Sequence, residues 1–247
     1  MDNEEFLLSL NNISKSFFDS KKQTDVLKNV SFNIKENEIV AILGPSGCGK
    51  STLLNILSSL ENQTSGNIIL NGKLGYMFQK DALLPWRNIL SNIYFGLEIK
   101  KQKTKENIEY ANNLINKYKL NDFIYNFPNQ ISGGMKQRVA LIRTLVLKPD
   151  LLLLDEPFSA LDAQTKISVQ NDVYNIIKQE KKSALIVTHD IGEAIALSDK
   201  IIILSDRPAQ VKSILNIELN FLSPLERRNN SKFNEYHSQI SRILGII

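Results

Sequence analysis

The sequence predicts an α/β protein whose sheet is mostly parallel and covered by helices on both faces. Three observations support this. After residue 150 the chain alternates all-apolar runs (LLLL, SALIV and KIIIL) with amphipathic stretches, a pattern typical of buried parallel strands between helices. From about residue 88 to residue 147 the apolar spacing is helical, and the N-terminal third contains short runs typical of strands.

The expected elements follow in chain order. The strands are expected within 6–14, 30–34, 38–43, 65–72 (closed by an Asn-Gly turn), 73–79, 150–157, 183–190 and 200–206. The helices are expected at 52–60, 88–99, 104–120, 135–147, 163–180 and 191–198. The helix that starts near residue 135 stops before Pro149, because proline cannot continue it. The tail from Ser223 onward is expected to form one amphipathic helix.

Composition restricts the class of protein. The chain has 247 residues with a net charge of +4, and its basic residues are spread out rather than gathered into a nucleic-acid-binding stripe. Its single cysteine cannot form an internal disulfide. The acidic start lacks the basic region of a secretory signal, and the apolar runs are too short to span a bilayer. We therefore expect a cytoplasmic protein that binds no nucleic acid.

A glycine-rich stretch, GPSGCGKST, lies between the apolar run EIVAIL and the helical run TLLNILSSL. It fits G-x-x-x-x-G-K-[ST], in which backbone N–H groups and a helix N-terminus surround phosphates. The lysine can bridge the β- and γ-phosphates, and the serine hydroxyl can bind Mg²⁺. The alternative is a chance glycine-rich turn. The residues expected to bind ATP are Gly44, Pro45, Ser46, Gly47, Cys48, Gly49, Lys50, Ser51 and Thr52.

Three polar side chains follow two other predicted buried strands. Asp155 and Glu156 follow the four leucines of LLLLDEP, and His189 follows SALIVT. The carboxyl ends of parallel strands meet at one edge of a sheet, where ligands bind, so these side chains are expected beside the phosphate loop. Asp155 can hold Mg²⁺, Glu156 can orient and polarise the attacking water, and His189 can contact the γ-phosphate or that water. The alternative is an acidic turn and a structural histidine.

The order of these motifs resembles the ATP-binding-cassette (ABC) ATPases. Besides the phosphate loop, the chain has FQ at 78–79, ISGGMKQR at 131–138, LLLLDEP, SALD at 159–162 and THD at 188–190. The resemblance covers roughly residues 7 to 210, and Ile131 departs from the family's usual leucine. It implies one ATPase domain over 5–220: a phosphate-loop NTPase core, an N-terminal antiparallel β subdomain and a helical subdomain inserted at about 86–147. The amphipathic helix of 221–247 is expected to pack on this domain.

The resemblance also implies roles for single residues. Phe17 would stack on the adenine ring, with Phe18 as its competitor for that role; both could instead be core residues. Gln79 would contact Mg²⁺ and the attacking water and would sense a membrane partner. The implied catalytic residues are thus Gln79, Glu156 and His189, and the implied metal ligands are Ser51, Gln79 and Asp155.

The stretch ISGGMKQR raises a separate question, because it places a Gly-Gly turn at the start of a second helix. Serine is a good N-cap, and glycines let backbone amides approach a phosphate closely. In the ABC ATPases two cassettes close head to tail, and each such turn faces the ATP of the other subunit. A simple capped helix is the alternative. The residues implied to contact ATP across the dimer are Ser132, Gly133, Gly134, Gln137 and Asp162.

Finer motifs narrow the function that the resemblance implies. LLPW at 83–86 and THDIGEAIALSDKIIILSDRPAQV resemble the nitrate, sulfonate and taurine importers, although ATPases for pyrimidine vitamin precursors share much of this pattern. The implied protein hydrolyses ATP at the cytoplasmic face of the membrane, with integral-membrane permease subunits and, indirectly, an extracytoplasmic solute-binding protein. An exporter ATPase and a soluble cassette acting on nucleic acid or ribosomes are the alternatives.

Overall fold

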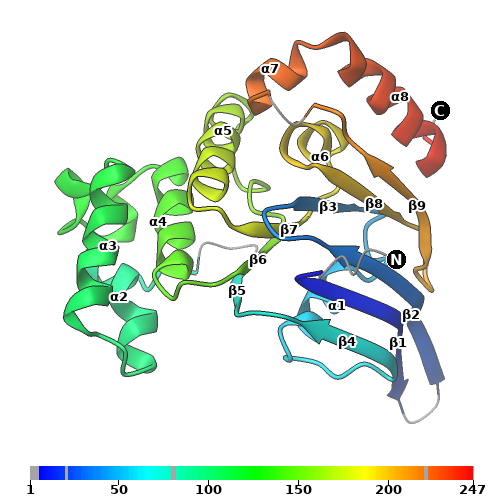
Figure 1. The fold of residues 1–247 in the computed structure, drawn as a ribbon, viewed down its shortest axis with the longest axis horizontal. Helices are drawn as coiled ribbons and strands as arrows, with labels where there is room; N and C mark the ends of the chain where they lie inside the picture. Colours follow the sequence, from blue (N-terminus) through cyan, green and yellow to red (C-terminus); the bar gives the residue numbers. More distant parts are fainter. Residues whose placement is uncertain (1–5, 20–21, 79–81, 220–221, 247) are drawn as a thin grey trace.

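The computed structural model describes residues 6–19, 22–78, 82–219 and 222–246. The strands are β1 (Leu8–Asp19), β2 (Lys22–Ile34), β3 (Ile39–Leu43), β4 (Ser65–Leu70), β5 (Leu74–Met77), β6 (Leu151–Asp155), β7 (Ser183–Val187), β8 (Lys200–Leu204) and β9 (Val211–Asn216). The helices are α1 (Lys50–Leu57), α2 (Ile89–Ile99), α3 (Lys105–Lys117), α4 (Gly133–Leu145), α5 (Ala163–Gln179), α6 (Ile191–Leu197), α7 (Pro224–Arg228) and α8 (Ser231–Leu244). The strands form two sheets (Figure 1).

The larger sheet has the strand order β5-β6-β7-β3-β8-β9. Its first five strands run parallel, and β9 pairs antiparallel with β8. Every residue of β3, β6 and β7 is buried. Because successive side chains of a strand point to opposite faces, such strands need cover on both sides. This confirms the predicted α/β class with a mostly parallel sheet.

The two faces of this sheet have different covers. Leu151 and Leu153 of β6 pack in a cluster with α1 and the smaller sheet. Leu152 and Leu154 of the same strand point the other way, toward α4 and α5. Beside them, α6 and α8 cover β3 and β8. The phosphate-loop helix therefore lies on one face, and the helices that follow the predicted catalytic strands lie on the other.

The smaller sheet is antiparallel, with the order β2-β1-β4. Its strands β1 and β2 extend well beyond the predicted runs. The prediction fell short because the outer halves of these strands are exposed and lack an apolar pattern. Strand β9 was absent from the sequence prediction for a similar reason. It lies at the sheet edge and alternates half-buried with exposed residues, so it carries no apolar run.

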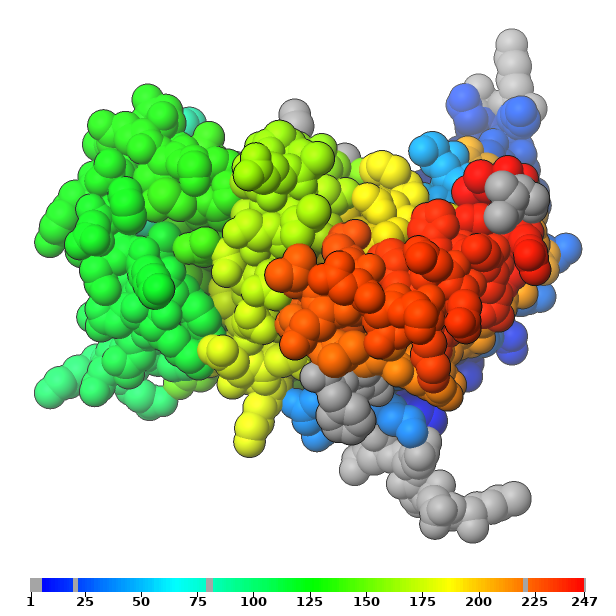
Figure 2. Space-filling model, turned by 90° about the horizontal axis from the view of Figure 1, so that it is seen from above, coloured from blue at the N-terminus to red at the C-terminus, as the bar shows by residue number. Residues whose placement is uncertain are grey.

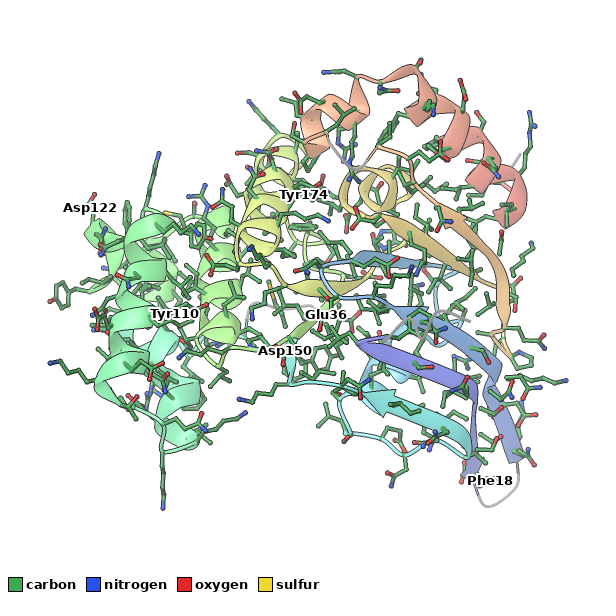
Figure 3. All side chains as sticks on the ribbon, viewed as in Figure 1. Phe18, Glu36, Tyr110, Asp122, Asp150 and Tyr174 are labelled. Atoms are coloured by element: carbon green, nitrogen blue, oxygen red, sulfur yellow. The ribbon has the colours of Figure 1, made fainter. Side chains whose placement is uncertain are left out.

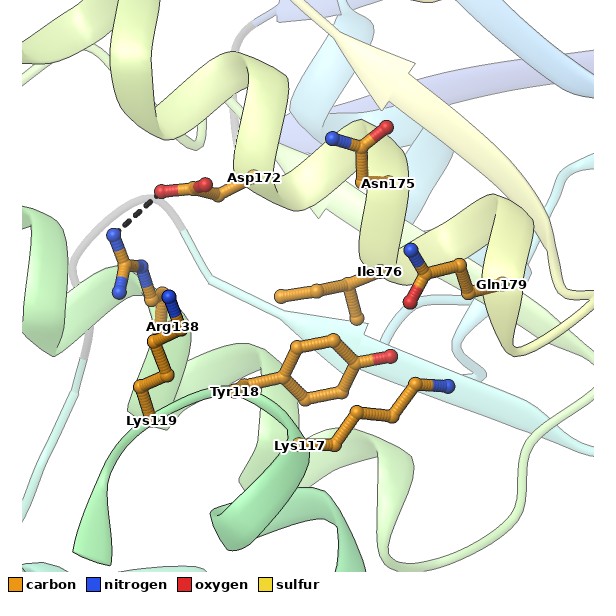
Figure 4. Close-up of a pocket in the computed structure, with 8 residues that line it drawn as sticks. All are labelled: Lys117, Tyr118, Lys119, Arg138, Asp172, Asn175, Ile176 and Gln179. Carbon is orange, nitrogen blue, oxygen red and sulfur yellow. Dashed lines mark hydrogen bonds and ion pairs between the residues drawn. The ribbon is translucent and has the colours of Figure 1, made fainter.

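Helices α2, α3 and α4 form a lobe at the left of Figure 1, in the chain between β5 and β6. Two ion pairs link this lobe to α5: Arg138 Nη2 lies 2.6 Å from Asp172 Oδ2, and Lys117 Nζ lies 2.7 Å from Glu180 Oε1. The side chains between them line a hollow of about 270 Å³ (Figure 4). Both ion pairs border the hollow, so we interpret it as the junction of the lobe with the core.

The carboxyl-terminal segment forms two helices where the sequence predicts one. α7 ends at Arg228, and Asn230 then caps α8 by accepting a hydrogen bond from the backbone of Lys232. This asparagine cap gives the chain a new helix start at the point where the apolar pattern alone suggests continuation. Both helices lie along α6, and α7 also reaches α5 (Figures 1 and 2). Within the described ranges, no helix is both long enough and apolar enough to cross a membrane.

Candidate active site

The phosphate loop connects β3 to α1. Gly47 and Gly49 adopt left-handed φ angles of 75° and 126°, which glycine tolerates best. A Cβ atom at Gly49 would also lie 2.8 Å from Val26 Cγ1. The loop curls around the buried Lys50, whose Nζ donates hydrogen bonds to the carbonyls of Gly44 (2.7 Å) and Pro45 (2.9 Å). The glycines of this turn are therefore required by the backbone conformation and by the close approach of Val26, and the lysine is placed to meet a phosphate.

The N-terminus of α1 fits an anion. Among the α-helices of the described chain, α1 alone lacks a side-chain hydrogen bond at its N-cap, which is Gly49. The first N–H groups of a helix need an acceptor, and the helix dipole favours a negative one. A phosphate group supplies such acceptors. The uncapped start of α1, with Lys50 beside it, is thus suited to the phosphates of a nucleotide.

Asp155 lies opposite the start of α1, as the sequence predicts. Its Oδ1 is 3.5 Å from Ser51 Oγ, and its Oδ2 is 3.5 Å from the hydroxyl of Tyr76. Asp155 is buried, and this burial raises the pKa of its carboxyl group. Tyr76 was not predicted as part of the site, because a tyrosine inside a short apolar strand gives no functional signal.

The donor set around Ser51 and Asp155 consists of oxygen atoms. Within the described part of the chain, no group of three or more His, Cys, Asp or Glu side chains could hold a metal ion. Mg²⁺ prefers oxygen ligands and keeps several waters or phosphate oxygens, so it needs only one or two protein side chains. The hydroxyl and the carboxylate fit such an ion.

Glu156 follows Asp155 in an unusual backbone conformation. Its φ angle is 42°, which costs a residue with a side chain about 1 to 3 kcal/mol. Its N–H donates to the Val187 carbonyl of β7 (2.9 Å), and its carbonyl accepts from the Ser159 hydroxyl (3.0 Å). These bonds hold the strained turn at the carboxyl end of the sheet. Strain of this kind is commonly retained at functional sites.

His189 lies beside Glu156, as expected from their places at the ends of neighbouring strands. Its Nδ1 is 3.2 Å from Glu156 Oε1, and its side chain is 58% exposed. A half-exposed histidine next to a carboxylate can contact a ligand that enters from solvent. The structure thus brings together the side chains predicted from two separate motifs.

The Gly-Gly turn begins α4. Ser132 is its N-cap and accepts a hydrogen bond from the Met135 N–H (3.3 Å). A Cβ atom at Gly133 would lie 2.9 Å from Leu161 Cδ2, and one at Gly134 would lie 2.6 Å from a Val169 methyl of α5. The glycines therefore also allow close packing of α4 on α5. This second reason for the glycines depends on contacts distant in sequence, so the motif alone did not reveal it.

The turn and the phosphate loop do not meet within one chain. Among the described residues, no hydrogen bond joins 44–52 to 132–138. Ser132 and Gly133 are exposed, whereas Gly134 and Gln137 are buried. Gln137 is 4% exposed, so in this conformation its side chain is not presented to a ligand. Asp162 is exposed and caps α5 through a hydrogen bond from the Thr165 N–H (3.0 Å), which lowers the pKa of its carboxyl group.

The predicted adenine-stacking phenylalanines and Gln79 are not among the side chains described above. Phe17 is 41% exposed, and Lys15 Nζ lies 4.7 Å from its ring centroid. Phe18 is 72% exposed at the far end of the β1–β2 hairpin (Figure 3). Both rings are therefore outside the core, and the one with a cationic neighbour is Phe17. The predicted Gln79 lies outside the described residues.

The motifs that form this site also match a known family. The pattern described as "ABC transporter" matches residues 27–159, which include the phosphate loop, the Gly-Gly turn and both site carboxylates. The chain belongs to the ABC transporter family. As a member of the ABC cassettes it is an ATPase that binds and hydrolyses ATP.

Curated ABC relatives match nearly the whole chain. An uncharacterised ABC transporter ATP-binding protein of Methanocaldococcus jannaschii is 41% identical, covering 96% of this chain and 91% of the relative. The aliphatic sulfonates import ATP-binding protein of Bacillus cereus is 38% identical, covering 94% of each. A bicarbonate transport ATP-binding protein of Synechocystis is also 38% identical, covering 89% and 81%.

A solved ABC cassette matches the fold. It is a dimer in a post-hydrolysis state with ADP and phosphate bound, and it is 31% identical to this chain. The match has a TM-score of 0.72 and covers 85% of this chain and 99% of that cassette. This confirms the predicted ABC-cassette architecture.

Proposed function

We propose that this chain is the ATP-hydrolysing subunit of an uptake transporter and that it drives import of a small anion through a separate membrane permease. One observation carries the hydrolytic part of the proposal: Glu156 and His189, 3.2 Å apart, lie at the same sheet edge as the Ser51–Asp155 contact. This edge therefore combines groups suited to phosphate, to a metal ion and to water.

The nucleotide site follows from these residues. The backbone N–H groups of the phosphate loop, which exclude that of Pro45, and the Lys50 ammonium would bind the phosphates, and Ser51 and Asp155 would hold Mg²⁺ together with Gln79. The ion, when bound, shields the negative charge of the phosphates. Phe17 would stack on the adenine, because its ring is exposed outside the core and aromatic rings favour stacked contacts.

Hydrolysis uses the two side chains beyond this loop. Glu156 accepts a hydrogen bond from the attacking water and orients it, and His189 steadies the Glu156 carboxylate and contacts the γ-phosphate. Phosphoryl transfer depends mostly on positioning and charge stabilisation. The strained turn at Glu156 is consistent with a carboxylate that must be held in one place.

Two copies of the chain complete the site. Ser132, Gly133 and Gly134 present amides at the start of α4, and within one chain they share no hydrogen bond with the phosphate loop in its described residues. The matched cassette structure is a dimer with ADP and phosphate bound. We infer a head-to-tail dimer in which these residues and Asp162 act on the ATP of the other copy. Gln137 would join them only after α4 shifts.

An apolar groove offers a place for the permease. A cavity of about 390 Å³ lies between β5, α2 and α4, and its apolar lining includes Phe78, Phe95, Ile99 and Leu147. Phe78 and Ile99 are 48% and 66% exposed. Exposed apolar patches commonly mark interaction sites. We infer that a cytoplasmic helix of the permease binds here, which places the chain at the cytoplasmic face of the membrane.

The class of solute rests on the relatives. Their names include aliphatic sulfonates and bicarbonate, which are small anions. We therefore favour a nitrate-, sulfonate- or taurine-type solute that an extracytoplasmic binding protein delivers; a pyrimidine vitamin precursor is the alternative. Co-purification of the permease and that binding protein, followed by identification of the bound solute, tests this. Purification without any membrane protein in mild detergent would contradict the permease assignment.

The enzymatic part is tested by Glu156→Gln, which keeps the size of the side chain and removes its charge. Loss of a general base lowers the rate by about 10²- to 10⁴-fold, whereas ATP binding should be retained. Glu109→Gln in α3 is the matched control, because Glu109 is exposed and lies in the helical lobe. Full activity of Glu156→Gln would overturn the catalytic assignment.

A further inference from the structure

A buried polar cluster lies behind the His189 loop, between α5, α6 and α7. Gln170 of α5 is fully buried and Glu193 of α6 is 2% exposed. Neither belongs to the nucleotide site proposed above. Buried polar side chains are costly unless they are paired, so their partners indicate what the cluster does.

The contacts of this cluster run from α7 to the loop. Arg228 Nη2 donates to Gln170 Oε1 (2.7 Å), and Gln170 Nε2 donates to Glu193 Oε2 (3.3 Å). Lys166 Nζ then lies 3.1 Å from the same Glu193 oxygen and 2.8 Å from Asp190 Oδ2. Successive contacts share a residue, and Gln170 and Glu193 are buried, so these bonds form one connected network.

Asp190 is the end of this series and the residue next to His189. Its Oδ1 accepts from the Glu193 N–H (2.9 Å), and its own N–H donates to Thr188 Oγ1 (3.1 Å). Asp190 is therefore tied on both sides. Because His189 lies between Thr188 and Asp190, these bonds also limit where the His189 backbone can move.

Arg228 also reaches this loop directly. A Cβ atom at Gly192 would lie 3.3 Å from both Arg228 Nη1 and Asp190 Oδ1, so the glycine leaves room for the guanidinium beside the carboxylate. Burial raises the pKa of Asp190, but Lys166 and Arg228 are among the groups that outweigh it and keep the carboxylate charged. The neighbouring Arg227 anchors α7, because it is fully buried and donates to the Ser198 carbonyl (2.7 Å).

We propose that α7 is a positioning element for His189: Arg228, through Gln170, Glu193 and Lys166, fixes Asp190 and thereby holds the histidine beside Glu156. This inference rests on the proposed role of His189. It assigns a catalytic purpose to the carboxyl-terminal helices, which the nucleotide-site motifs do not touch. Arg228 contacts no reacting group, so it acts through His189 alone.

The test compares Arg228→Ala and Arg228→Lys with Arg242→Ala. Arg242 is an exposed arginine of α8, so its replacement removes the same charge from the same segment. We expect Arg228→Ala to lower kcat about tenfold, because small misplacements of catalytic groups are expensive. The KM for ATP should change little, and Arg228→Lys should restore part of kcat. The unfolding midpoint should fall, because Arg228→Ala leaves the buried Gln170 oxygen without its donor, so the His189 signals are the readout that separates positioning from stability.

A histidine NMR spectrum provides a readout independent of turnover. The chain has two histidines, so labelled His189 and His237 give two sets of signals that a His237→Gln variant assigns. Arg228→Ala should shift the His189 signals, whereas Arg242→Ala should leave them in place. A merely structural role of Arg228 would move the unfolding midpoint without moving the His189 signals.

The outcomes separate this inference from the proposed function. If His189→Ala abolishes turnover but Arg228→Ala keeps wild-type kcat and His189 signals, the inference is wrong and the proposed role of His189 stands. If His189→Ala itself keeps wild-type turnover, the proposed role fails. In single-turnover measurements, Arg228→Ala should add no further loss to His189→Ala; an additive loss would contradict action through the histidine.

Discussion

Replacement of the buried Arg227 by methionine tests whether the carboxyl-terminal helices belong to the folded core. Its guanidinium donates to the carbonyls of Ser198 (2.7 Å) and Leu222 (3.2 Å) and to the hydroxyl of Tyr174 (3.3 Å). It also lies 3.6 Å from Asp199 Oδ1. Methionine fills much of the same volume, so the change removes the charge and the donors while keeping apolar contact.

The cost can be worked from these contacts. Breaking a buried ion pair costs about 3 to 5 kcal/mol when one charge is left unpaired. Asp199 retains two partners, Lys178 Nζ (2.8 Å) and the Ile39 N–H (2.9 Å), so the lower end applies. A loss of about 3 kcal/mol corresponds to a fall of about 6 to 12 °C in Tm for a chain of this size.

Differential scanning calorimetry of Arg227→Met, with Arg242→Met as the exposed control, measures this loss. The control should stay within about 2 °C of the wild type, because surface substitutions change stability by no more than about 0.5 kcal/mol. Equal Tm values for the two variants would refute the reasoning. They would mean that the polar contacts around α7 contribute nothing net and that the two helices are an appendage of the domain.

Three further changes have defined outcomes. Lys50→Ala should weaken ATP binding at least about tenfold in calorimetric titration, because a charged hydrogen bond contributes about 1.5 to 3 kcal/mol. Glu180→Gln should destabilise the lobe junction by about 2 kcal/mol at pH 7. Burial raises the pKa of Glu180, but Lys117 and other donors lower it below 4.5 overall. A carboxyl group whose pKa is lower in the folded protein than in the unfolded chain stabilises the fold at pH values above its unfolded pKa. In urea unfolding, the difference in free energy of unfolding between Glu180→Gln and the wild type should therefore fade as pH falls below 4.5. Gly134→Ala should destabilise by about 1 to 2 kcal/mol through overpacking, and a second change, Val169→Ala, should recover part of that loss in the same unfolding assay.

Much of the fold follows from local pattern. The buried strands β3, β6, β7 and β8 are continuous apolar runs, and such runs can sit only inside a covered sheet. Their carboxyl ends carry the phosphate loop, the carboxylates and the histidine. Because parallel strands bring those ends to one edge, the amino-acid pattern alone is enough to place these separate motifs together.

The features that escaped the sequence either have a weak local pattern or depend on distant contacts. The edge strand β9 has no apolar run, and the asparagine that starts α8 divides a helix that periodicity alone continues. The close approach of Gly134 to Val169 joins residues of two different helices. Arginine is usually exposed, so nothing local marks Arg227 as fully buried. The spacing of apolar residues indicates which face of a helix or strand is buried. It does not indicate which distant residues pack against that face.

The most direct test of the account is the mass of Glu156→Gln by light scattering, with and without ATP. The account predicts one chain of 28.0 kDa without nucleotide and two chains with it, because hydrolysis no longer separates the pair. Adding Ser132→Arg should keep ATP binding by the single chain and prevent pairing. A Glu156→Gln chain that binds ATP but stays single, or a Ser132→Arg chain that loses ATP binding as a monomer, would contradict the shared site.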